Sequence, residues 1–162
     1  MIGALVGCVT MRSAPPTPEV ALELPFKGRL LGVPSAQAPP AIAASISCSS
    51  PIIFSYREEL SHEHHTVPMV LSALNPLTYL GAPTGTTGVT AFADLSISDG
   101  DRVIGDYTAA VHATADYSIF SGESYLELDR EARAQVRREI DDKVIADLDR
   151  LTRQIAARGP QP

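Results

Sequence analysis

The 162-residue chain has no tryptophan, and aromatic residues make up only 6% of it. Alanine, serine and threonine are plentiful instead. The core of the single domain that this length allows should therefore consist of small and aliphatic side chains. There are only two cysteines, Cys8 and Cys48, so at most one disulfide can form within the chain.

Basic residues are in deficit, and long apolar runs are missing. The net charge is −6 and the pI is near 5.1. This balance argues against a nucleic-acid partner and against a basic membrane-binding face, since both need an excess of Lys and Arg. The segment closest to an apolar run, Val67 to Ala82, is broken by Pro68, Asn75 and Pro76. It falls short of the roughly 18 continuous apolar residues of a membrane-spanning helix.

The N-terminus carries the most specific short motif. Leu5-Val6-Gly7-Cys8 is a small aliphatic run that ends in Gly-Cys, and it resembles the lipobox of Gram-negative bacterial lipoproteins. The resemblance implies that the bond before Cys8 is cut, that its sulfur carries lipid, and that residues 1–7 are the remnant of a signal peptide. No Lys or Arg precedes Cys8, so we expect a positively charged segment further upstream. The alternative is an apolar N-terminal strand with an incidental cysteine.

A Pro-rich spacer follows the motif. Residues 8–18 include Pro15, Pro16 and Pro18, so they cannot form a helix or a central strand. An apolar start, a cysteine and such a tether are the layout of a lipid-anchored protein, which would face the periplasm from a membrane of the cell envelope.

The second cysteine has two expected states. If Cys8 is lipidated, Cys48 is unpaired, and we expect it to be buried with an apolar strand at residues 41–47. If Cys8 is not lipidated, a Cys8–Cys48 disulfide can form in an oxidising compartment.

The strongest local signal is a β-hairpin around residues 89–111. Apolar residues alternate with polar ones on both sides of Asp99 and Gly100, and glycine accepts the positive φ of a tight turn. Another strand is expected at residues 51–54. Strands first and a helix last predict a single α+β domain over residues 19–158, in which a small antiparallel sheet packs against a long C-terminal helix.

The C-terminal helix is expected from Tyr125 to Arg158, followed by a disordered tail at 159–162 that begins with a helix-ending Gly-Pro. At 1.5 Å per residue it would be about 50 Å long, so we expect a bend or break near Leu128–Ala134, or a protruding end. Its apolar stripe comprises Val136, Ile140, Val144, Leu148, Leu151 and Ile155. Three pairs have the i,i+4 spacing of ion pairs on the solvent face, namely Asp129/Arg133, Glu139/Lys143 and Asp149/Arg153.

The stripe has two interpretations. It can pack on the sheet of its own domain, or its last part (Leu148, Leu151 and Ile155) can dock a partner protein or a second copy of the chain. The excess length of the helix keeps the second interpretation open.

His62, Glu63, His64 and His65 form a cluster of metal-ligand residue types. Zinc and copper bind imidazole, so His62, His64 and His65 are candidate ligands, which His112 of the hairpin could join. The spacing is not that of an H-E-x-x-H zinc helix. The alternative is a solvated polar loop at residues 57–66.

The sequence contains no catalytic motif that we can identify. We expect the glycine-rich segment 81–88 to be a flexible loop. It lacks the lysine of a phosphate-binding loop, and no G-x-S-x-G elbow is present. We therefore predict a non-enzymatic envelope lipoprotein without a cofactor, acting as a scaffold or accessory subunit of a membrane-associated assembly. Two alternatives are a metal-binding periplasmic protein that uses His62–His65 and a soluble cytoplasmic domain that dimerises through its C-terminal helix.

Overall fold

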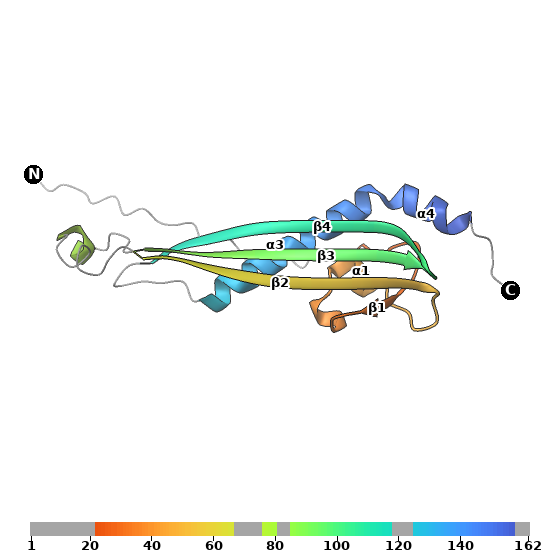
Figure 1. The fold of residues 1–162 in the computed structure, drawn as a ribbon, viewed down its shortest axis with the longest axis horizontal. Coiled ribbons are helices and arrows are strands. Elements are labelled where there is room, and N and C mark those ends of the chain that lie inside the picture. Colours follow the sequence, from red (N-terminus) through yellow and green to blue (C-terminus); the bar gives the residue numbers. More distant parts are fainter. Residues whose placement is uncertain (1–21, 67–75, 81–84, 118–124, 158–162) are drawn as a thin grey trace, which may run out of the picture.

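The computed structural model describes residues 22–66, 76–80, 85–117 and 125–157 of the chain. Its strands are β1 (Arg29–Leu31), β2 (Ile52–Thr66), β3 (Gly85–Asp99) and β4 (Arg102–Tyr117). Its helices are α1 (Pro40–Ala44), α3 (Tyr125–Ala146) and α4 (Leu148–Ala156), with short 3-10 turns η1 (Ser35–Gln37) and η2 (Pro76–Leu80). The strands form one sheet in the order β1-β2-β3-β4, in which only the β1–β2 pair is parallel. This is the α+β fold that the sequence predicts (Figure 1).

The predicted hairpin is present and is longer than expected. It spans β3 and β4, from Gly85 to Tyr117. Gly100 has a φ of 58° and begins a two-residue turn between the strands, as in a type II′ turn, whose first central position requires a positive φ. Its lack of a Cβ atom therefore permits the tight connection.

Strict alternation assigns the two faces of the sheet. In β3 the odd-numbered residues are buried, Val89, Leu95 and Ile97 completely, whereas Phe92 and Asp94 are exposed. Helix α3 packs across β3 and β4 on the buried face and crosses the strands obliquely (Figure 1). The other face carries no helix among the described residues.

The apolar stripe of the C-terminal helix packs on the sheet of its own domain. Val136, Ile140 and Val144 of α3 are completely buried, and so is Leu151 of α4. The predicted break near residues 128–134 is wrong, since α3 continues through that segment and the helix breaks at Asp147 instead. At this position the Asp147 carboxylate binds the Tyr107 hydroxyl of β4.

The prediction of an extended segment at residues 41–47 is also wrong. Residues 40–44 form α1, because Pro40 at the first helical position has the φ that a helix needs. The carboxylate Oδ2 of Asp141 on α3 accepts a hydrogen bond from the Ala41 amide at 3.0 Å, which satisfies one of the amides at the start of α1. Cys48 follows this helix and is exposed, not buried as we expected.

Two segments that we expected to be loops belong to the sheet. Residues 57–66 continue β2, where His62 pairs with Val89, and β3 begins at Gly85 within the glycine-rich segment 81–88. Polar residues on both faces of β2 hide its alternation in the sequence. The N-terminal motif with Cys8, the tether and the tail at 159–162 lie outside the described residues.

Truncating the helix stripe should destabilise the fold. We expect Ile140→Ala to lower the free energy of unfolding by about 2–5 kcal/mol, because this side chain is completely buried between α3 and the sheet. Ile145→Ala on the same helix is the matched control. Ile145 is 37% exposed, so its change should stay within about 0.5 kcal/mol of the wild type. Urea unfolding followed by circular dichroism measures both, and equal effects of the two substitutions would contradict the packing described here.

Candidate functional site

Among the described residues, the face of the sheet that α3 does not cover carries exposed side chains of β2, β3 and β4. Three cross-strand rows run over β2, β3 and β4 on this face, namely Arg57–Asp94–Thr108, Glu59–Phe92–Ala110 and Ser61–Thr90–His112. We call these nine residues the open face. Eight of the nine are exposed, and Thr90 is half-buried. Phe92 lies at the centre and is 47% exposed.

The open face is polar around one aromatic ring. Arg57 and Glu59 form an ion pair at 3.5 Å, and the Thr90 hydroxyl lies 2.9 Å from Nδ1 of His112. Across the strands, Phe92 lies between Glu59 of β2 and Ala110 of β4. An apolar ring within a polar rim is the arrangement that protein–protein contacts use.

The covered face contains a buried ion cluster centred on Glu58. The Glu58 side chain is only 4% exposed. Arg137 of α3 donates to both of its oxygens, at 2.7 and 3.2 Å, and Arg133 donates to Oε1. The Tyr56 hydroxyl donates to Oε2 at 2.9 Å. The cluster joins the middle of β2 to α3, and its donors satisfy both carboxylate oxygens.

These contacts change the acidity of the groups involved. Burial raises the pKa of Glu58, but hydrogen bonds from Arg137, Tyr56 and Arg133 and the charge of Arg137 outweigh it, so the pKa is lowered overall. The pKa of Tyr56 is raised, first by burial and then by the charge of Glu58. Glu58 is therefore ionised at neutral pH, with both of its oxygens already engaged.

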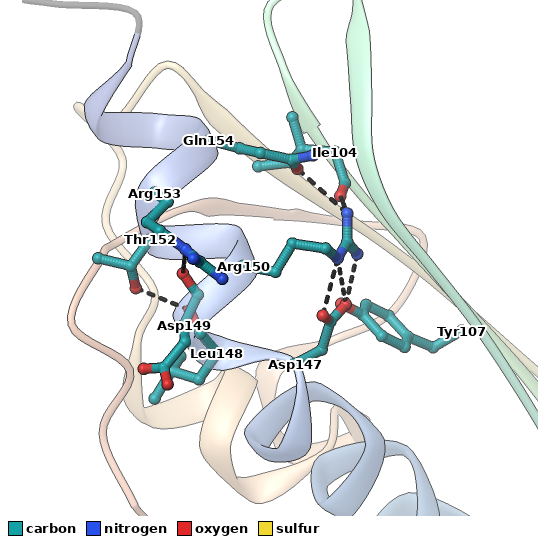
Figure 2. Close-up of polar contacts among 9 residues, drawn as sticks. All are labelled: Ile104, Tyr107, Asp147, Leu148, Asp149, Arg150, Thr152, Arg153 and Gln154. Atoms are coloured by element: carbon teal, nitrogen blue, oxygen red, sulfur yellow. Dashed lines mark hydrogen bonds and ion pairs between the residues drawn. The ribbon is translucent and has the colours of Figure 1, made fainter.

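A second polar cluster holds the break between α3 and α4 (Figure 2). The Tyr107 hydroxyl of β4 donates to Asp147 Oδ2 at 2.7 Å, and Arg150 Nε donates to the same carboxylate at 2.7 and 2.9 Å. Arg150 also donates to the backbone carbonyl of Ile104 in β4 at 2.9 Å. The chain therefore turns at Asp147, which brings α4 back onto the edge of the sheet.

The pKa shifts and the close packing around this cluster also indicate that it holds the break between α3 and α4. Burial, followed by the hydrogen bond to Asp147, raises the pKa of Tyr107, and the hydrogen bond from Arg150 lowers the pKa of Asp147. Gly105 makes room for α4, because a Cβ there would come within 2.8 Å of the Tyr107 ring and 3.1 Å of Leu151. The tyrosine thus stays protonated as a donor, and the cluster is structural.

Lysine and arginine from the helices also cover part of the sheet edge. Lys143 Nζ donates to the carbonyl of Thr108 at 2.6 Å, as Arg150 does to that of Ile104. β4 is an edge strand, and cations on its free carbonyls discourage pairing with another chain.

The candidate metal ligands are not brought together where the structure describes them. His62 in β2 lies on the covered face, where its Nε2 is 2.8 Å from Asp129 Oδ1 of α3. His112 is on the open face, so it cannot join His62. His64 and His65 lie in β2, but their side chains are outside the described part of the structure. Among the described residues, no three His, Cys, Asp or Glu side chains are grouped as metal ligands.

The residues predicted for docking lie at the α4 end of the molecule. Leu151 is completely buried in the core, and Leu148 and Ile155 are partly buried against it. Leu151 is therefore unavailable on the surface of this structure, because it fills the space over Gly105 in β4.

One of the three predicted ion pairs is confirmed. Glu139 and Lys143 are 2.8 Å apart. The members of the first pair bind residues of β2 instead, since Arg133 contacts Glu58 and Asp129 contacts His62. In the third pair, Arg153 Nε donates to the backbone carbonyl of Asp149 on the same helix.

Sequence reasoning missed the Glu58 cluster, although a signal was present. Glu58 continues an alternation of Ile52, Phe54 and Tyr56, which places its carboxylate on the buried face. A buried carboxylate needs cations, and Arg137 follows the stripe residue Val136 directly.

Comparison with known proteins adds remote similarities only. No family model and no curated protein matches the chain. A proposed lipoprotein of Caulobacter crescentus CB15 is similar in structure, with 12% identity, a TM-score of 0.40, and coverage of 75% of this chain and 86% of that one. Rare lipoprotein B of Shewanella oneidensis has 11% identity, a TM-score of 0.29 and coverage of 66% and 68%. A minor lipoprotein of Acinetobacter baumannii has 15% identity, a TM-score of 0.34 and coverage of 90% and 100%.

No described helix is both long enough and apolar enough to cross a membrane.

Removing the charge of Glu58 should destabilise the protein. We expect Glu58→Gln to lower the free energy of unfolding by about 3 kcal/mol at pH 7, because Arg137 and Arg133 lose their buried counter-charge. Glu59→Gln is the matched control, since this neighbouring side chain is 69% exposed on the open face and should change stability little.

The effect should depend on pH in a defined direction. The lowered pKa of Glu58 means that its contribution is complete above the ordinary glutamate pKa of about 4.3. It is lost as the pH falls from there through the lower pKa of the folded state. The difference between wild type and E58Q should shrink over this range in urea unfolding, and a difference that grew on acidification would contradict the assignment.

Proposed function

We propose that this chain is a lipid-anchored, non-enzymatic protein of the bacterial cell envelope. It faces the periplasm and serves as a scaffold or accessory subunit of a membrane-associated assembly. The observation that carries the proposal is Leu5-Val6-Gly7-Cys8 followed by a Pro-rich tether. The tether would set the folded part at a distance from the membrane surface.

The arrangement of the folded part supports a binding role. The polar clusters of Glu58 and Asp147 have partners within the chain, which suits a structural role more than acid–base chemistry. The open face offers Phe92 within a polar surface. We propose this face as the contact with a protein partner in the envelope.

Lipidation is tested at the cysteine itself. When the gene is expressed with its natural upstream sequence in a Gram-negative host, the protein should fractionate with membranes, and mass spectrometry should find acyl groups on Cys8. Cys8→Ser should release it to the soluble fraction. Cys48→Ser is the control and should stay membrane-bound, because Cys48 is an exposed thiol of the folded domain. An unmodified Cys8 in mature protein would sink the proposal.

The partner contact is tested by photo-crosslinking in cells. A photoreactive residue in place of Phe92 should give an adduct of one defined mass in the envelope fraction, because the ring is the apolar centre of the open face. The same residue in place of Arg138, exposed on α3, is the control and should give none. No adduct from Phe92, or the same adducts from both positions, would count against the open face.

A further inference from the structure

The 3-10 turn η2 is an apolar tip at one end of the molecule. Leu77, Tyr79 and Leu80 in this five-residue segment are 57%, 62% and 82% exposed, and Thr78 is buried between them. Figure 1 shows η2 (yellow-green) beyond the ends of β2 and β3, at the opposite end of the molecule from α4. The strands therefore carry three large apolar side chains away from the core.

The sequence around this tip is uncharged over a long distance. No Asp, Glu, Lys or Arg occurs between Glu63 and Asp94. The opposite end contrasts with it, since the β3–β4 turn includes Asp99, Asp101 and Arg102. In a chain that is 20% charged, the tip can therefore enter a bilayer interface without desolvating an Asp, Glu, Lys or Arg side chain of this segment.

We propose that the η2 tip inserts into the interfacial layer of a lipid bilayer. Leucine side chains gain free energy when they leave water for the acyl region, and tyrosine favours the headgroup level because its ring is apolar and its hydroxyl is polar. A 3-10 segment of five residues is far too short to cross the hydrocarbon core, so the interfacial layer is the depth that it can reach. The partner is the apolar surface of the bilayer, without a requirement for anionic lipid.

A protein partner fits this feature less well. A stable protein interface buries on the order of 800 Å² on each side, around a closely packed centre. The described part of the tip presents three exposed apolar side chains, far fewer than the residues that such an interface uses. A bilayer accepts a small convex insertion, because lipids rearrange around it.

The absence of tryptophan makes insertion directly measurable. Tyr79→Trp introduces the single tryptophan of the chain at the tip, and Val103→Trp places a matched one at the other end, since Val103 is 60% exposed beside the β3–β4 turn. Both are made in full-length protein with Cys8→Ser, so that no lipid anchor contributes. With phosphatidylcholine vesicles, the emission of Tyr79→Trp should shift to the blue and be quenched by brominated acyl chains. The emission of Val103→Trp should not change.

Vesicle flotation gives an independent readout. In the same Cys8→Ser background, Leu77→Ser with Leu80→Ser should lower binding to phosphatidylcholine vesicles at least about tenfold, as expected when two leucines no longer leave water. Val103→Ser should leave binding unchanged, and circular dichroism checks that all variants are folded.

Three results would overturn this inference. They are no blue shift of Tyr79→Trp with vesicles, an equal response of both tryptophans, and a shift that needs no lipid and rises with protein concentration. The last result would assign the tip to a second copy of the chain. Because the anchor cysteine is absent throughout, each of these results leaves the lipidation of Cys8 untouched.

Discussion

The burial of one face of a long sheet by a shorter helix is the constraint on which the rest of the structure depends. β2 and β3 each have 15 residues and extend over about 50 Å at the usual rise of a strand. α3 has 22 residues and reaches only about 33 Å. The helix stripe therefore covers part of one face, α4 extends the cover beyond the break at Asp147, and the far ends of the strands project past the core.

Two polar clusters fix the position of the helices on the sheet. Contacts between small aliphatic side chains alone would specify this position only weakly. Glu58 binds Arg133 and Arg137, which are one helical turn apart, so sliding α3 by a turn would break the cluster. Tyr107 and Arg150 hold Asp147 at the other end. A buried ion cluster contributes little net stability compared with apolar packing, but breaking it is costly. These residues therefore determine the position of the helices along the sheet.

The local features of the fold could be predicted from the sequence, and the features set by distant partners could not. The alternation around Gly100 predicted the hairpin, and the repeat of Val136, Ile140 and Val144 predicted the helix face, because each pattern lies within one element. Residues 57–66 were expected to be a loop because the buried carboxylate of Glu58 interrupts the apolar alternation, and its partners lie 75 and 79 residues away. The break at Asp147 depends likewise on Tyr107, 40 residues away. The open face could have been predicted, since Phe92 stands among polar residues on the solvent side of the alternation.

The same geometry places the two proposed contact surfaces apart. Covering one face with α3 leaves the opposite face polar and uncovered by a described helix, with Phe92 in the middle of β3. The length of the strands beyond α3 places η2 at an end of the molecule, away from the middle of β3 (Figure 1). A contact at the tip and a contact on the open face therefore do not compete for the same residues. If the tip contacts a bilayer as proposed, Phe92 stays available to a protein partner on the face of the sheet.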